Sequence, residues 1–146
     1  MICKYFEDHS IGEKARSARA RTITETDVVF FCYLTGNWFS IHSDAEFAKK
    51  TQFGQRIVQG ALTFALAPGL QPTDANFVIA NYGIDKLRFT NPVFIGDTIH
   101  SEAEIVAKQE KGPDRGVITF RQDMKNQRDQ LVATMEWKLL VKRRPS

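Results

Sequence analysis

Hydrophobic and polar positions follow different periods in the two halves of this chain. In the first half, the segment from Arg56 to Gly69 is rich in Ala and Leu and is apolar almost all round. A helix with hydrophobic residues on every side is a buried helix. The pattern therefore predicts a buried central helix over this segment, and Pro68 and Gly69 are expected to end it.

The second half alternates with a period of two, which is typical of β-strands. In Leu131 to Val141 the alternate positions are nearly all apolar on one face, so that face should be buried. Shorter or similar patterns predict strands over 77–80, 84–89, 98–108 and 116–125, with a hairpin loop at 126–130. Helices followed by an antiparallel run indicate an α+β fold in which a sheet wraps one apolar helix. We expect one domain spanning residues 1–146.

Two shorter helices are expected before the central one. Thr24 can cap a helix whose third residue is Asp27, and Gly36 is a suitable residue to end it after about Leu34. Ser43 or Asp44 can cap a second helix over 45–50, and the cap is the expected role of Asp44. The segment 14–23 alternates loosely and is predicted to be an edge strand.

Composition narrows the possible functions. The chain has 146 residues, of which 42% are hydrophobic and 25% charged, and its net charge is +3. These values are ordinary for a soluble globular protein, and the charge is too small for a typical nucleic-acid binder. We see neither a membrane-spanning run nor a signal peptide, so we expect a cytoplasmic protein without a membrane or nucleic-acid partner. Cys3 and Cys32 are too far apart for a CxxC motif and are predicted to be free thiols.

Candidate chemistry lies in two neighbouring motifs, Thr35-Gly36-Asn37-x-x-x-x-His42-x-Asp44 and Phe53-Gly54-x-x-Ile57-Val58-x-Gly60. Together with Thr24-x-x-Asp27, the opening Ile11-Gly12-Glu13 and the segment from Arg88 to Thr98, they resemble the MaoC-type hydratases of the hot-dog fold. This family is also called (R)-specific enoyl-CoA hydratases or acyl dehydratases. The resemblance covers nearly the whole chain. Each motif alone is weak, but the motifs occur in the right order at the right separations and are strong together.

The resemblance implies a curved antiparallel sheet around a long helix and a homodimer with acyl-CoA near the subunit boundary. In the family, the residue at position 37 is typically an aspartate and the one at position 42 is a histidine, and this pair holds and ionises a water molecule. The backbone N–H of Gly60 supplies an oxyanion donor. The implied reaction is reversible hydration of a 2-enoyl thioester, on coenzyme A or an acyl carrier, to a 3-hydroxyacyl thioester, with no cofactor and no metal.

The chemistry explains why these groups would be needed. Water adds at C3 and a proton at C2 while negative charge develops on the thioester oxygen, which an N–H at a helix N-terminus stabilises. Gly60 would let the thioester approach its N–H, or it would merely allow close packing of helix on sheet. His42 could move a proton near neutral pH, or it could only hydrogen-bond locally.

The chain departs from the family pattern at three places. Asn37 carries an amide, which cannot act as a general base. Phe39 and Ser40 stand where the family often has Asn-Pro, and Gln59 stands where a second His commonly precedes the glycine. Three explanations remain open: His42 alone transfers the proton while Asn37 orients water, the protein is a thioesterase or an acyl-CoA binder on the same scaffold, or the chain is an inactive variant.

Further substrate contacts are expected from bulky and basic side chains. Trp38 and Phe39 add bulk near the predicted pocket, and Gln59 lies beside Gly60 in the sequence. Arg56, Lys86 and Arg88 are candidates to bind the phosphates of coenzyme A. The other two histidines, His9 and His100, match nothing in the motifs and are expected at the surface.

Overall fold

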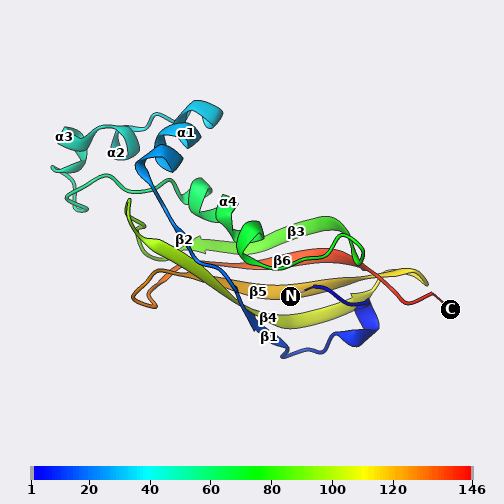
Figure 1. The fold of residues 1–146 in the computed structure, drawn as a ribbon. Coiled ribbons are helices and arrows are strands. Elements are labelled where there is room, and N and C mark those ends of the chain that lie inside the picture. Colours follow the sequence, from blue (N-terminus) through cyan, green and yellow to red (C-terminus); the bar gives the residue numbers. More distant parts are fainter. Residues whose placement is uncertain (1, 146) are drawn as a thin grey trace.

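The computed structural model describes residues 2–145, which form one antiparallel sheet and a set of helices (Figure 1). The helices are the 3₁₀ helix η1 (Phe6–Asp8), α1 (Glu25–Thr35), α2 (Ser40–Ser43), α3 (Ala45–Ala48) and α4 (Gly60–Leu70). The strands are β1 (Lys14–Arg16), β2 (Arg21–Thr22), β3 (Val78–Phe89), β4 (Thr98–Glu110), β5 (Arg115–Lys125) and β6 (Leu131–Lys142). The predicted α+β class is confirmed.

The sheet has the strand order β1-β4-β5-β6-β3, and β2 pairs with β4 beside β1. The strands β4, β5 and β6 are joined by successive hairpins, whereas β3 pairs with β6, the last strand of the chain. Asn126 closes the predicted hairpin loop at 126–130, since its N–H donates to the Gln130 carbonyl at 3.0 Å. Within residues 2–145, β3 therefore forms one edge of the sheet.

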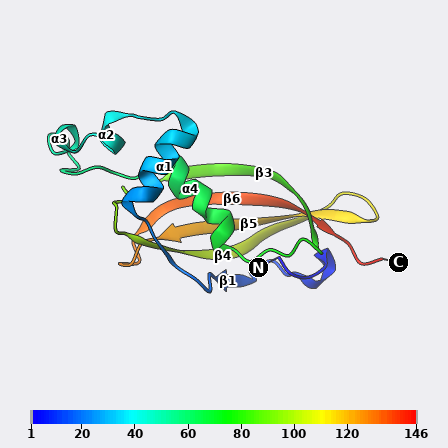
Figure 2. The same cartoon turned by 45° about the horizontal axis from the view of Figure 1, so that its top comes forward.

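The helix α4 lies across one face of the sheet, over β6 and its neighbours (Figure 2). The buried face of β6 is the one that its alternation predicted, and it includes Met135, Trp137 and Val141. The ring of Phe64 on α4 stacks on Trp137, with ring centroids 5.7 Å apart. Burial of these large side chains is the main contribution that holds helix and sheet together.

The start of α4 differs from the prediction because the preceding residues bond to another segment. Val58 donates its N–H to the Val93 carbonyl at 2.8 Å, and Ile57 forms a bridge with Phe94. Both residues are therefore extended, and the helix begins only at Gly60. Its other end is also displaced, since Pro68 lies in the last turn and the helix continues to Leu70. The prediction of an all-round buried helix is wrong in part, because Ala61, Ala65 and other small residues of α4 are exposed.

The helix α1 begins and ends where its sequence signals predicted. The Asp27 N–H donates to the Thr24 hydroxyl, and the Thr24 N–H donates back to the Asp27 carboxylate, which completes a capping box. Gly36 ends the helix in the left-handed region at φ 70°, where glycine has no steric penalty. Asp44 caps α3 as expected, by accepting from the Phe47 N–H at 2.9 Å. The short helix α2 between them was not predicted.

The helices α1, α2 and α3 project together beyond one end of the sheet, whereas η1 packs near its other end (Figure 1). The predicted strand over 14–23 is broken into β1 and β2, and the two predicted strands over 77–80 and 84–89 are one bulged strand, β3. Each bulge shifts the register of pairing with β6 and so interrupts the alternation of hydrophobic and polar residues. For this reason the sequence pattern predicted two short strands instead of one. None of the described helices is long and apolar enough to cross a membrane.

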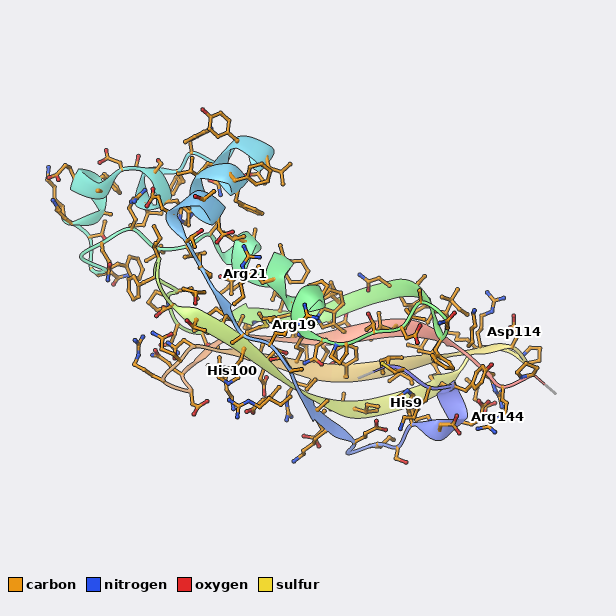
Figure 3. The ribbon with its side chains drawn as sticks, viewed as in Figure 1. His9, Arg19, Arg21, His100, Asp114 and Arg144 are labelled. Carbon is orange, nitrogen blue, oxygen red and sulfur yellow. The ribbon has the colours of Figure 1, made fainter. Side chains whose placement is uncertain are left out.

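The prediction that His9 and His100 lie at the surface is wrong. His9 is 2% exposed and His100 is 8% exposed, and both lie in the sheet layer, away from the projecting helices (Figure 3). Each ring keeps one nitrogen near a carboxylate: His9 Nδ1 lies 3.2 Å from Glu13, and His100 Nε2 lies 3.3 Å from Asp129. The two histidines were placed at the surface because they match no motif. The lack of a motif gives no information on whether a residue is buried.

The two ends of the described chain are joined by ion pairs. Arg143 Nε donates to Glu7 at 2.7 Å and Arg144 Nη2 donates to Asp8 at 2.5 Å, so η1 is fixed to the segment that follows β6. The hydrogen bond from Arg143 lowers the pKa of Glu7 to about 2, and the backbone N–H of Arg144 acts in the same direction. The folded protein therefore holds Glu7 ionised at a pH where the unfolded chain would protonate it.

This pKa predicts a defined pH dependence of stability. A carboxylate with a depressed folded pKa contributes stability above its unfolded pKa, near 4.5, and the contribution is lost as the pH falls toward about 2. Thermal unfolding of Glu7→Gln and the unchanged protein should differ most above pH 5 and converge near pH 2. Glu46→Gln, which removes the exposed pair with Lys49, is the matched control and should leave the profile unchanged. A constant difference between the two proteins from pH 6 to pH 2 would contradict the assignment.

Candidate active site

A cavity of about 340 Å³ lies where the projecting helices meet the first turn of α4. Its wall includes His42 from α2, Gly60 and Thr63 from α4, and Phe89 from the end of β3. The remaining lining residues come from the loop before α4, from the turn after β3 and from β6; they are Phe53, Ile57, Val58, Thr90, Asn91, Pro92, Val93 and Val132. Two of the predicted catalytic residues, His42 and Gly60, therefore share one cavity.

The orientation of the His42 ring follows from one hydrogen bond. His42 Nδ1 lies 2.8 Å from the carbonyl oxygen of Ile57. Because a carbonyl only accepts, Nδ1 must carry the proton in this contact. The neutral ring then has its lone pair on Nε2, so Nε2 is the nitrogen that can accept a proton. The local hydrogen bond and a proton-transfer role are thus compatible, since they use different nitrogens.

Gly60 is the first residue of α4, where backbone N–H groups have no acceptor within the helix. The helix dipole adds a partial positive charge at the same place. A Cβ atom at Gly60 would lie 3.0 Å from the ring of Phe89, so the glycine also allows β3 to approach the helix closely. Both sequence interpretations of Gly60, the packing one and the oxyanion one, agree with this position.

Asn37 is exposed and is not among the residues that line the cavity. Its side-chain oxygen accepts from the Phe39 N–H at 3.3 Å, and its own N–H donates to Thr35. Phe39 in turn lies near His42, with ring centroids 6.5 Å apart. Asn37 and His42 thus contact the same aromatic residue, while a direct meeting of the two side chains remains a prediction.

The two bulky neighbours of Asn37 face solvent. Phe39 is 70% exposed and Trp38 is 48% exposed, and the Trp38 ring packs edge-on against Tyr33 of α1. Neither residue lines the cavity within this chain. Large exposed aromatic residues that gather at one end of a molecule are typical of a surface that another molecule covers.

Gln59, a predicted substrate contact, is buried under α1 instead. Its amide nitrogen donates to the Val28 carbonyl at 3.3 Å and contacts Cys32 Sγ at 3.1 Å. The residue is 1% exposed and does not line the cavity. Gln59, which stands where the family commonly has a second histidine, therefore links the start of α4 to α1. Within residues 2–145, Cys3 and Cys32 form no disulfide, as predicted.

The three basic candidates differ in how their charge is already used. Arg56 forms two hydrogen bonds with Glu25, at 2.9 and 2.5 Å, and these lower the pKa of the Glu25 carboxyl. Lys86 pairs with Glu136 at 2.8 Å. Arg88 donates to the neighbouring carbonyl of Leu87, and it makes no ion pair with any residue in 2–145. Of the three candidates, Arg88 is therefore the one whose charge could bind an incoming anion without displacing a carboxylate of this chain.

Sequence reasoning missed Thr63 and Asn91 as cavity residues. Thr63 follows Gly60 by three positions, so the two lie on one face of α4, and this spacing was the available signal. Asn91 donates to the Leu131 carbonyl at 2.8 Å and fixes the turn after β3. Asp97, in the Gly-Asp pair of the same signature, is buried and accepts from the Phe94 N–H at 2.9 Å. This signature therefore shapes the cavity wall.

The arrangement suits proton transfer without a metal ligand set. No group of three or more His, Cys, Asp or Glu side chains within residues 2–145 could hold a metal ion. The cavity combines one basic ring nitrogen, one helix N-terminus and a largely apolar wall. Such a combination can activate water and stabilise a developing oxyanion in a site of low dielectric.

Comparison with known proteins places this arrangement among related folds. A monoamine oxidase regulatory protein from Archaeoglobus superposes with a TM-score of 0.90 at 44% identity, covering 99% of this chain and all of that one. An (R)-specific enoyl-CoA hydratase from Rhodospirillum rubrum is 31% identical over 121 residues, which are 83% of this chain and 81% of that protein. A Mycobacterium tuberculosis protein with a double hotdog fold superposes with a TM-score of 0.87 at 21% identity, over 98% of this chain and 45% of that one.

The chain spans less than half the length of two other curated relatives that it matches, 29% of one and 41% of the other. The superpositions nevertheless cover nearly all of this chain and confirm the predicted hot-dog fold. The model of the MaoC like domain family matches residues 7–126, which run from η1 to the β5–β6 hairpin and include the whole cavity wall except Val132. The chain belongs to the MaoC-like dehydratase family.

Proposed function

We propose that this protein reversibly hydrates a 2-enoyl thioester to the 3-hydroxyacyl thioester. The observation that carries the proposal is the hydrogen bond from His42 Nδ1 to Ile57, because it leaves Nε2 basic in a cavity that also contains the N-terminus of α4. Relatives named as an (R)-specific enoyl-CoA hydratase and as 3-hydroxyacyl-thioester dehydratases support the same reaction class.

In the proposed step, Nε2 of His42 accepts a proton from water while the water oxygen bonds to C3. The electrons of the double bond move onto the thioester oxygen, which accepts a hydrogen bond from the Gly60 N–H. The protonated ring then returns its proton to C2, and the carbonyl re-forms. Asn37 holds the water through its amide, and Arg88 meets a phosphate of the carrier, coenzyme A or an acyl carrier protein.

A second candidate, a non-catalytic acyl-CoA-binding protein, is favoured by one observation. Position 37 carries a neutral amide, and loss of a general base commonly costs about 10²–10⁴ in rate. The decisive assay follows the absorbance of crotonyl-CoA beside a free-thiol assay. Loss of absorbance without free thiol supports the hydratase; free thiol from saturated acyl thioesters indicates a thioesterase. Thermal stabilisation by acyl-CoA with neither reaction indicates a binder.

We also propose that the protein is a homodimer formed through the edge of β3. This edge carries the exposed residues Ile79, Tyr82 and Phe89, and an uncovered sheet edge invites pairing with another strand. Antiparallel pairing of two copies of β3 would create one continuous sheet with both α4 helices on the same face. It would also cover the exposed small residues of α4.

Light scattering is expected to give twice the chain mass of 16.6 kDa at micromolar concentration. Ile79→Lys should shift the protein toward the monomer, because it places a charge on the pairing edge. Ile11→Lys changes an equally apolar, exposed residue before β1 and should leave the mass unchanged. A monomer at micromolar concentration for the unchanged protein would refute the dimer.

A further inference from the structure

Four polar side chains line the active-site cavity: His42, Thr63, Thr90 and Asn91. Each of them donates a hydrogen bond to a backbone carbonyl, at distances from 2.7 to 3.3 Å. Apart from the second N–H of the Asn91 amide, these side chains therefore offer only acceptors to a ligand. A polar ligand group that binds beside them must bring a proton to donate.

The amide of Asn91 has a fixed orientation. Its nitrogen donates to the Leu131 carbonyl at 2.8 Å, and the same carbonyl accepts from the Thr90 hydroxyl at 2.7 Å. The opposite amide orientation would bring two oxygens that only accept into contact. Asn91 Oδ1 has no hydrogen-bond partner within residues 2–145, yet it is not among the fully enclosed polar atoms of that range that lack one. Because Asn91 is half-buried, Oδ1 is an accessible acceptor on the cavity wall.

The carrier of an acyl thioester brings a matching donor. In coenzyme A and in acyl carrier proteins, an ethylene link joins the thioester sulfur to the first amide N–H of the pantetheine arm. An amide that leaves water for a largely apolar cavity loses free energy unless its N–H finds an acceptor. Because Gly60 and Asn91 line one cavity of about 340 Å³, a thioester oxygen bound at the Gly60 N–H leaves this amide within the same space.

We propose, resting on the hydratase function above, that Asn91 Oδ1 accepts the hydrogen bond of the pantetheine amide nearest to the thioester. Arg88, the proposed phosphate contact, precedes Asn91 by three residues, at the end of β3. Three residues of extended chain span at most about 10 Å, which the arm between the phosphate and this amide is long enough to cover. The arm then follows this segment from Arg88 to Asn91, and the thioester reaches Gly60.

This contact makes Asn91 a residue that determines specificity for the arm of the thioester. The pantetheine arm is common to coenzyme A and to acyl carrier proteins, so Asn91 selects for the arm and accepts either carrier. A thioester whose arm has no N–H at this position would leave Oδ1 facing a group that cannot donate. Such a substrate would bind less well, although its reacting enoyl group is unchanged.

The test compares two crotonyl thioesters that differ in one group of the arm. Crotonyl N-acetylcysteamine contains the amide N–H, whereas the S-(2-acetoxyethyl) thioester has an ester oxygen in its place. We expect kcat/KM for hydration to be about tenfold higher with the amide, the value of one hydrogen bond that the ester leaves unmade. Asn91→Leu should remove this preference, chiefly by lowering kcat/KM for the amide substrate.

Thr90→Val is the matched control, because it removes the other side-chain hydrogen bond to the Leu131 carbonyl and leaves Asn91 in place. It should keep the preference for the amide, whatever its effect on the two rates together. Equal kcat/KM for amide and ester in the unchanged protein would overturn the proposal without the use of any variant. It would also be overturned if Asn91→Leu kept the preference or lowered hydration of both thioesters by the same factor.

A binding measurement separates this inference from the reaction itself. In calorimetric competition against butyryl-CoA, butyryl N-acetylcysteamine should bind about tenfold more tightly than its S-(2-acetoxyethyl) analogue, and Asn91→Leu should remove the difference. If neither crotonyl thioester is hydrated but the difference in binding is present, the hydratase proposal fails and the Asn91 contact holds. If hydration proceeds and neither measurement distinguishes amide from ester, the contact is overturned and the hydratase proposal holds.

Discussion

Replacing His42 with asparagine should abolish hydration while the protein stays folded. An asparagine amide can still donate to the Ile57 carbonyl, which His42 Nδ1 contacts at 2.8 Å, but it has no counterpart of the basic Nε2. Loss of a general base commonly lowers kcat by about 10²–10⁴, and we expect a fall toward the upper end because position 37 offers no carboxylate to compensate.

His42→Ala completes the comparison, because it removes the basic nitrogen and the hydrogen bond to Ile57 together. Both variants should lose activity, but only the alanine variant should also lower the melting temperature, since it leaves the Ile57 carbonyl without this donor. Steady-state hydration of crotonyl-CoA and thermal unfolding measure the two effects separately. An asparagine variant with more than about a tenth of the original kcat would refute proton transfer by His42, as that loss lies below the range for general-base removal.

Replacing Asn37 with aspartate should retain or raise hydration. The carboxylate would restore a base near the water that the family's aspartate and histidine hold together, and the rise could approach the 10²–10⁴ commonly associated with a general base. The change adds no atoms to the side chain, and residue 37 is exposed, so the fold should be unaffected. Aspartate also keeps the oxygen that accepts from the Phe39 N–H.

The pH profile distinguishes a new base from a general improvement. If the carboxylate introduced by Asn37→Asp acts as base, kcat should fall at low pH as that group becomes protonated, and this limb should be weaker in the unchanged protein. Asp44→Asn is a control at a neighbouring acidic position, because Asp44 caps α3 and does not line the cavity. If neither the protein nor the Asn37→Asp variant hydrates any enoyl-CoA of about four to twelve carbons, a range that suits a pocket of ordinary size, an acyl-CoA-binding or thioesterase function replaces the hydratase.

Local signals predicted the structure best where a single segment contains all the interacting groups. The capping box of Thr24 and Asp27, the left-handed Gly36 and the buried face of β6 are all complete within one segment, and each was found from the sequence. The start of α4 was misplaced because the bonds that extend Ile57 and Val58 come from the distant segment at 93–94. No periodicity within the helix records that contact.

The residues of the candidate site also fall into those that local motifs predicted and those that depend on distant segments. The motif spacing identified His42 and Gly60, which share the cavity, but it could not reveal that Gln59 turns under α1 toward Cys32. The burial of His9 was missed because it depends on a partner across the fold: its carbonyl accepts from Lys108 at 2.5 Å.

The strand order has a consequence for how the chain folds. The hairpins β4–β5 and β5–β6 join neighbouring segments, so their closure costs little loop entropy, whereas β3 must pair with β6 across two intervening strands. We therefore expect the three-stranded meander to form before the folding transition state and β3 to dock afterwards. Substitutions in β3 should then mainly accelerate unfolding, and those in β5 should slow folding. Because β3 is also the proposed pairing edge, association of two chains would stabilise the strand that docks last. It would thereby lengthen the lifetime of the folded protein.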